Sequence, residues 1–233
     1  MKFKIDNKIF EQYSSLNIGV IIAKGIDNTD ENSDILAMLA EQSNIIKDGY
    51  SLETLKEVPK IHAWREAYRA FGAKPKKYTC SVENLYRMIL EGVQLRHINK
   101  VVDLYNYISL KHMMPVGGDD IDKIDGDIVL RFAEGDESFV HLNTNEVDHP
   151  KKNEVVYADD KEILCRRWNW RECDKSKMTE KTKNIALVVE GLSPASEKEI
   201  QSIVEELGQL VEKFCSGKIS TYILNTENKE VEF

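Results

Sequence analysis

The eight residues CRRWNWRE, from Cys165 to Glu172, concentrate side chains that can do chemistry. They hold three arginines, two tryptophans, an asparagine and a glutamate, in a chain whose formal net charge is −8. Tryptophan and arginine form planar, donor-rich surfaces. A carboxylate beside them can orient an amine or a water molecule. The stretch therefore predicts a site in which Glu172 supplies the carboxylate.

The same stretch also fits an edge strand whose large and charged side chains stack across a sheet. Strand alternation would place Arg167, Asn169 and Arg171 on one face, and the two tryptophans with Glu172 on the other. One face would then be polar and rich in hydrogen-bond donors, and the other would hold a carboxylate beside aromatic rings.

Charge is sorted along the chain. Residues 60–100 carry nine Lys or Arg against three Glu, and residues 161–183 carry eight basic against four acidic side chains. Residues 119–160 are the reverse, with thirteen acidic and four basic side chains. Concentrated Lys and Arg are what phosphate binding needs, so the basic segments are candidate RNA contacts despite the acidic average.

The stretch KPKK at 74–77 is the centre of the first basic segment. Its three lysines could grip phosphates together with two arginines of the preceding helical stretch, or could be a solvated loop. The candidate RNA-binding residues are Arg65, Arg69, Lys74, Lys76 and Lys77. On charge alone, a nucleic-acid contact and a solvated surface both remain open.

The usual signatures of catalysis are missing, since the chain has no phosphate-binding glycine loop, G-x-S-x-G, H-E-x-x-H or dinucleotide fingerprint. The five histidines are scattered, and each is expected to be structural or exposed. The four cysteines lack metal-ligand spacing, so we expect reduced, mostly buried thiols and neither a metal nor a cofactor. No run reaches the ~18 apolar residues of a membrane span, and no secretory signal opens the chain, which predicts a cytoplasmic protein without membrane contact.

Periodicity predicts the elements that must position these residues. Strand patterns fall at the amino terminus (MKFKIDNKIF) and at 18–23, 127–132, 138–142, 154–158, 162–168, 184–190 and 218–224. Helical patterns begin at caps or first-turn residues Ser33, Pro59, Ser81, Asn99 and Ser193-Pro194. The pair Gly117-Gly118 fits a turn, or a place where backbone approaches a ligand. We predict one α+β domain over 1–233, with mixed or antiparallel sheets and helices segregated to one side.

The segment INKVVDLYNYISLKHMMPVGGDDIDKIDGDIVLR, at 98–131, resembles the B3/B4 module of the bacterial phenylalanyl-tRNA synthetase β subunit. That module has VVD-x-x-NY, a proline, a D-x-D-[KR]-I ending and a strand with an arginine. The matching residues are Val101-Val102-Asp103, Asn106-Tyr107, Pro115, Asp120, Asp122-Lys123-Ile124 and Arg131. The whole chain, including HAWREAYRAFGAKPKKYTCSVENLYRMILEG at 62–92, is similar to stand-alone proteins of this family.

The resemblance implies an editing pocket that, in the synthetase, hydrolyses tRNA charged with tyrosine in place of phenylalanine. It implies tRNA or aminoacyl-tRNA as the partner, and DNA is not expected. Its acidic residue falls on Glu172, and the match extends through Thr182 and Asn184. The implied catalytic residues are Glu172 and Asn106. The candidate substrate-binding residues are Gly117, Gly118, Arg166, Arg167, Asn169 and Thr182. Aminoacylation is not expected, because the synthetase core is missing.

The chain departs from the module in two places. Gly117 stands where the module has its editing histidine, and residues 166–171 replace a small, glycine-rich strand. The three arginines of that stretch would bring positive charge to the opposite wall of the pocket, which predicts a substrate more polar or more acidic than tyrosine. Two functions therefore remain open: a free-standing hydrolase that deacylates aminoacyl-tRNA, and a non-catalytic module that binds RNA or a small ligand in the same pocket. A third reading is an adaptor that binds an unknown protein through the acidic segment 119–160.

Overall fold

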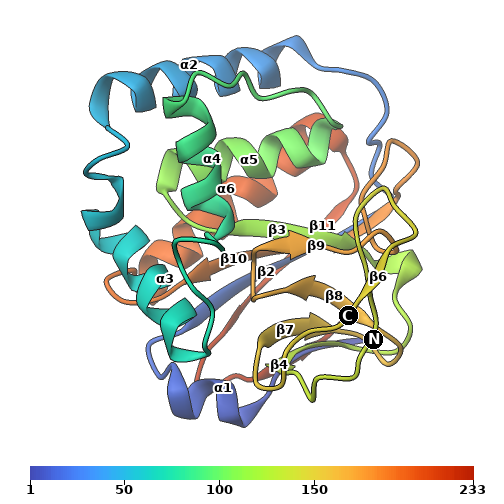
Figure 1. The fold of residues 1–233 in the computed structure, drawn as a ribbon. Coiled ribbons are helices and arrows are strands. Elements are labelled where there is room, and N and C mark those ends of the chain that lie inside the picture. Colours follow the sequence, from blue (N-terminus) through green and yellow to red (C-terminus); the bar gives the residue numbers. More distant parts are fainter.

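The computed structural model describes residues 1–233 (Figure 1). The helices are α1 (Asn7–Gln12), α2 (Ser33–Gly49), α3 (Pro59–Ala70), α4 (Ser81–Leu90), α5 (Lys100–His112) and α6 (Glu197–Cys215), with 3-10 turns at Leu55–Glu57 and Ile121–Lys123. The strands are β1 (Lys2–Ile5), β2 (Asn17–Lys24), β3 (Val116–Asp120), β4 (Ile128–Phe132), β5 (Phe139–Val140), β6 (Val147–Asp148), β7 (Val155–Ala158), β8 (Ile163–Arg166), β9 (Arg171–Glu172), β10 (Asn184–Gly191), β11 (Lys218–Leu224) and β12 (Glu230–Glu232).

Two main sheets form the centre of the molecule. One has six strands in the order β12-β1-β4-β7-β8-β9, in which only β1 and β4 are parallel. The other is an antiparallel sheet in the order β11-β2-β10-β3, so β3 lies at its edge. A short pair, β5 and β6, stands apart.

The four-stranded sheet is buried on both faces, which explains the continuous apolar runs of β2 and β10. Along β2, Val20 and Ile22 pack toward the six-stranded sheet, whereas Ile21 and Ala23 pack toward α5 and α6. Because successive strand residues point to opposite faces, one strand fills both cores. The layers are therefore helices, the four-stranded sheet and the six-stranded sheet.

The predicted class, α+β with mixed and antiparallel sheets and segregated helices, is confirmed. Figure 1 shows α2, α4, α5 and α6 gathered on one side, while α3 runs down the edge of the molecule toward the short α1. No helix of the structure has the length and apolar character needed to cross a membrane. All four cysteines are free thiols, three of them buried.

Several local predictions were wrong at element ends. The amino-terminal strand stops at Ile5, because the Asp6 side chain accepts the backbone N–H of Lys8 and caps α1. The last helix begins at Glu197 with Ser196 as its cap, not at Ser193-Pro194. Four short strands lie outside the predicted ranges: β3, β6, β9 and β12.

Candidate functional site

A cavity of about 630 Å³ opens between the edge strand β3 and the β8–β9 hairpin. The start of α4 and the segment 141–146 complete its wall. Ligand pockets usually measure ~300–1,000 Å³, so this volume suits a small molecule or the end of a larger one. The cavity therefore forms where the two sheets meet.

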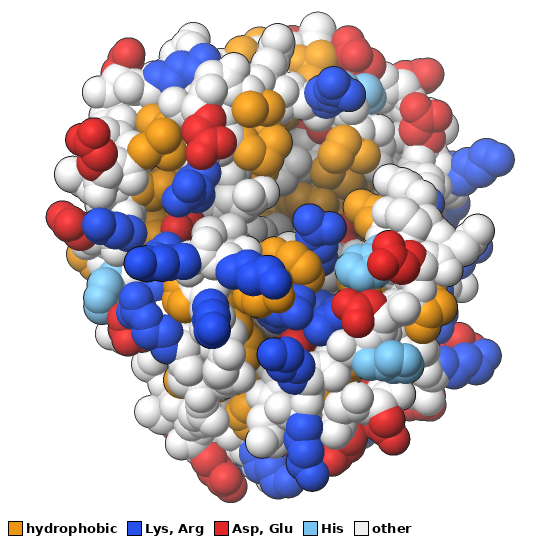
Figure 2. Space-filling model, viewed as in Figure 1, with side chains coloured by type: hydrophobic (Ala, Val, Ile, Leu, Met, Phe, Trp, Pro, Cys, Tyr) orange, Lys and Arg blue, Asp and Glu red, His pale blue; other side chains and the backbone are white.

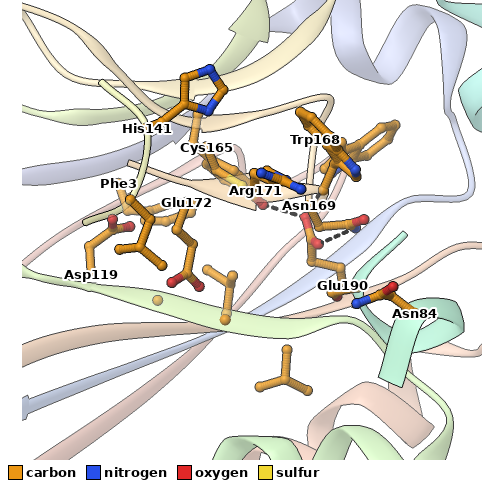
Figure 3. Close-up of a pocket in the computed structure, with 18 of the residues that line it drawn as sticks. Phe3, Asn84, Asp119, His141, Cys165, Trp168, Asn169, Arg171, Glu172 and Glu190 are labelled. Atoms are coloured by element: carbon orange, nitrogen blue, oxygen red, sulfur yellow. Dashed lines mark hydrogen bonds between the residues drawn. The ribbon is translucent and has the colours of Figure 1, made fainter. Parts of the chain in front are cut away.

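Glu172 is the central carboxylate of this cavity (Figure 3). It lies on β9 and pairs across the ladder with Cys165. Its Oε1 is 3.2 Å from the position that a Cβ at Gly117 would occupy, so nothing separates the carboxylate from β3. Burial, with the negative charge of Asp119, raises the pKa of Glu172 to about 8, and the Gly118 backbone N–H partly opposes the rise.

Asp119 is a second carboxylate of the same wall. Burial raises its pKa to about 6, although the Ser176 hydroxyl donates to its Oδ1 at 2.5 Å and favours the ionised form. Figure 3 shows the Asp119 and Glu172 carboxylates on the same side of the cavity. Two such groups with elevated pKa values can share a proton, accept one from water or bind a cation.

Glu190 organises a third part of the wall from β10, where it is 1% exposed. Its carboxylate accepts three hydrogen bonds, from Tyr157 Oη at 2.5 Å, Trp168 Nε1 at 2.7 Å and Asn169 Nδ2 at 2.6 Å. Burial raises the pKa of Glu190 to about 7 against these donors. The sequence analysis missed Glu190, whose only signal is a carboxylate within the apolar strand IALVVEG (185–191).

The stretch from Cys165 to Glu172 is part of a hairpin, not one alternating strand. Residues 167–170 form the turn between β8 and β9, with left-handed backbone at Arg167 (φ 47°) and Trp168 (φ 68°). The turn carries Trp168 into the core, where its ring meets Trp64 edge-on at 5.0 Å. Trp170 stays half-buried and lines the cavity. Burial of Trp168 therefore overrides the strand alternation that the sequence of this stretch indicates.

The arginines lie in three different environments. Arg166 is 2% exposed, and its Nε donates to Glu154 Oε1 at 3.0 Å while Nη1 pairs with Asp148. Arg167 is 7% exposed, and its Nε lies 3.8 Å from Glu154 Oε2. Neither lines the cavity, whereas the exposed Arg171 does.

The cavity is consequently acidic, and the expected wall of three arginines is absent. Four carboxylates line it, and the only cationic residue beside them is Arg171, with His141 as the sole histidine. The acidic residues are Asp119, Glu146, Glu172 and Glu190. His141 Nε2 lies 3.5 Å from Asp148 Oδ2. This charge favours a cationic or amine-bearing ligand over the acidic one that the sequence suggested.

The structure brings four of the predicted site residues together in the cavity: Gly117, Gly118, Asn169 and Glu172. Asn106 is half-buried on α5 and does not line this cavity. Thr182 is buried, and its hydroxyl donates to Asp120 Oδ2 at 2.7 Å.

The predicted RNA-binding residues also lie close together. Arg65, Arg69, Lys74 and Lys76 line a surface groove of about 380 Å³. Arg65 Nη1 donates a hydrogen bond to Glu83 Oε1 at 2.6 Å, and the Glu83 side chain is only 1% exposed. Figure 2 shows Lys and Arg side chains gathered beside and below a hollow on this face.

Comparison with known proteins assigns the family. The model of the B3/4 domain matches residues 63–223. The phenylalanine–tRNA ligase β subunit of Chromobacterium violaceum is 41% identical over 78 residues, 34% of this chain and 10% of the relative. That of Psychrobacter arcticus is 32% identical over 127 residues, 51% of this chain and 16% of the relative.

A solved N-terminal fragment of the phenylalanyl-tRNA synthetase β subunit from Pyrococcus horikoshii aligns with a TM-score of 0.47 at 14% identity, over 92% of this chain and 49% of that one. The segments matched in the two bacterial ligase subunits amount to a sixth or less of their lengths. The family model, by contrast, covers most of this sequence. The chain belongs to the B3/4 domain family.

Proposed function

We propose that this chain is a free-standing hydrolase that cleaves the ester between an amino acid and tRNA. The observation that carries the proposal is the pair of Glu172 and Asp119, whose carboxylates line one cavity beside the two glycines of β3. The B3/4 relatives are phenylalanine–tRNA ligase subunits, which supports tRNA as the carrier of the substrate.

The acidic lining suits the α-ammonium group that every aminoacyl ester carries. A carboxylate near a cation in a partly dry cavity is favoured in its ionised form, so a bound ammonium group would lower the pKa of Glu172 from about 8. Asp119 would supply the second negative charge. The bare edge of Gly117 leaves the space in which the ammonium group or a water molecule sits against Glu172.

Hydrolysis then follows from positioning. The water oxygen bonds to the ester carbonyl carbon, the water proton passes to Glu172, and the bond to the ribose oxygen breaks. The ribose hydroxyl leaves with the returned proton. The amide of Asn169, which Glu190 holds in place, would orient the ester.

One observation favours the alternative of a non-catalytic module. Gly117 offers no acid or base, and His141 is the only imidazole along the wall. A pocket that binds an aminoacyl end or an amino acid without cleaving it would need Glu172 and Asp119 but no histidine.

Deacylation assays separate the two readings. We would incubate the protein with a panel of cognate and mischarged aminoacyl-tRNAs and measure release of the amino acid. Glu172→Gln should lower the rate by about 10²–10⁴-fold, the usual contribution of a general base, with unchanged thermal stability. Glu41→Gln is the matched control, because Glu41 is exposed on α2, makes no hydrogen bond or ion pair and does not line the cavity. Release at the spontaneous rate for the whole panel refutes the hydrolase.

Binding of tRNA is tested through Lys74 and Lys76, which line the groove, and the neighbouring exposed Lys77. Changing Lys74, Lys76 and Lys77 together to Ala should weaken binding and reduce the slope of log K against log salt by about 2–3, because each phosphate contact releases counterions. Arg65 is left intact, since its guanidinium holds Glu83. A control triple variant removes three exposed lysines elsewhere: Lys8, Lys47 and Lys198. Equal affinity in both variants would mean that the groove is only a solvated surface.

A further inference from the structure

Aromatic and cationic side chains alternate between the basic groove and the cavity. The Arg167 guanidinium carbon lies 3.8 Å from the Tyr78 ring centroid and 4.3 Å from that of Trp170. Arg171 continues the stack on Trp170, at 4.7 Å. Lys77 lies over Tyr78 at 5.2 Å. The stack therefore contains a cation next to each aromatic ring.

The inner and outer members of the stack play different parts. Arg167 is buried, and its Nη1 has no hydrogen-bond partner, so the side chain is held by its two rings and the charge of Glu154. Arg171 is exposed, and its guanidinium makes no hydrogen bond or ion pair. Trp170 is half-buried and lines the cavity beside it. Arg167 thus fixes the rings, while Trp170 and Arg171 remain accessible at the mouth.

The stack is continuous with the groove in both sequence and space. Lys74 and Lys76 line the groove, and Tyr78 follows them in the segment that joins α3 to α4. The Tyr78 ring meets Trp170 edge-on at 5.0 Å. Figure 2 shows the basic side chains reaching the hollow on this face. A ligand that followed these residues would run from the groove into the cavity that holds Glu172.

We propose that this stack is the binding path for the single-stranded end of an RNA. Grooves for single strands combine basic side chains that follow the phosphates with aromatic side chains on which unpaired bases stack. Here the lysines and Arg171 would take phosphates, and Trp170 would take a base. Bases inside a duplex are stacked on each other and cannot reach a ring in this way. The inference deepens the proposed hydrolase and rests on it for the identity of the group that the cavity receives.

Tryptophan fluorescence gives a direct test, because the chain has three tryptophans and two of them are buried. Trp64 is 2% and Trp168 0% exposed, so Trp170 is the only tryptophan on which a base can stack. A single-stranded RNA of four nucleotides that carries no amino acid should quench the emission saturably. Trp170→Phe should remove the quenching but keep the affinity measured by fluorescence anisotropy of a labelled RNA.

Two further variants measure the energetics. Trp170→Ala should weaken binding about 5- to 100-fold, the range for loss of one base-stacking partner. Arg171→Gln should weaken it and reduce the salt slope by about 0.7, the value for one phosphate on a single strand. Arg87→Gln is the control, because Arg87 is exposed on α4 and only loosely paired with Glu91, at 3.7 Å. Thermal denaturation would confirm that each variant is folded.

Three results would overturn the path. These are wild-type affinity in both Trp170→Ala and Arg171→Gln, equal quenching by a duplex RNA of the same length, and equal quenching by a poly-glutamate peptide. The probe carries no aminoacyl ester, so the outcome does not depend on catalysis. Quenching without any deacylation would support the binding path and refute the hydrolase activity. Deacylation without quenching would refute the binding path alone.

Discussion

The two adjacent glycines of β3 should respond in opposite ways to alanine. At Gly118, a Cβ would lie 2.3 Å from the carbonyl oxygen of Ala186 and 2.9 Å from Leu187 Cα. Both are backbone atoms of the neighbouring strand β10, so they cannot rotate away. Gly118→Ala therefore requires β3 to separate from β10, with which it pairs over five residues.

The magnitude follows from strain and lost pairing. Inserting a methyl group into a well-packed region costs about 1–3 kcal/mol, occasionally more. Each backbone hydrogen bond lost from the ladder adds about 0.5–1.5 kcal/mol. We expect a loss of about 3–5 kcal/mol in the free energy of unfolding. Since 1 kcal/mol shifts Tm by ~2–4 °C in a chain of this size, Tm should fall by roughly 10 °C.

Gly117→Ala is the matched comparison. Its Cβ would meet only Glu172 Oε1, at 3.2 Å, and that atom ends a flexible side chain. Alanine also loses less backbone entropy than glycine on folding, so stability should change by less than about 1 kcal/mol. The displaced carboxylate should nevertheless reduce deacylation or ligand binding.

Thermal and urea denaturation, together with the deacylation assay, would measure both effects. The expected pattern is a large drop in Tm for Gly118→Ala and a loss of activity at near-normal Tm for Gly117→Ala. A Tm within 2 °C of wild type for Gly118→Ala, well below the ~10 °C expected from the overlap, would refute the close approach of β3 to β10. Equal destabilisation by both variants would refute the assignment of Gly117 to the cavity face.

Three other predictions follow from the carboxylates. Deacylation should rise with pH and level off above the Glu172 pKa of about 8, or lower when an ammonium group is bound; a rate independent of pH from 5 to 9 contradicts Glu172 as the base. Burial raises the pKa of Glu190 to about 7, which is above its value in the unfolded chain, so the native state binds more protons. The free energy of unfolding should therefore fall as pH rises toward 7, by on the order of 3 kcal/mol. Urea titrations of Glu190→Gln at several pH values should show a shallower decline, and an unchanged slope counts against the buried carboxylate. Arg65→Ala should cost about 3–5 kcal/mol in a urea titration, because it leaves Glu83 buried without a partner; a loss under 1 kcal/mol would mean that the pair is solvated.

The sequence by itself was sufficient where the information is local. Apolar runs located β2 and β10, and the cap at Asn99 located the start of α5, whose Val102 N–H the Asn99 side chain accepts. These features depend on backbone periodicity and on the capping chemistry of neighbouring residues, both of which are legible in a short window. The family motif placed Glu172 and the glycine pair in one site for the same reason, since the motif is itself a sequence pattern.

Only the tertiary structure decided where the side chains of residues 165–172 lie. Arg166 pairs with Glu154, twelve residues earlier, and Trp168 donates to Glu190, twenty-two residues later. Neither partner can be chosen from sequence spacing, because several carboxylates are available and packing selects among them. Burial of Trp168 forms the turn, removes two arginines from the cavity and leaves its wall acidic. The raised pKa of Glu172 likewise arises from desolvation and from Asp119, which tertiary packing brings to the same wall.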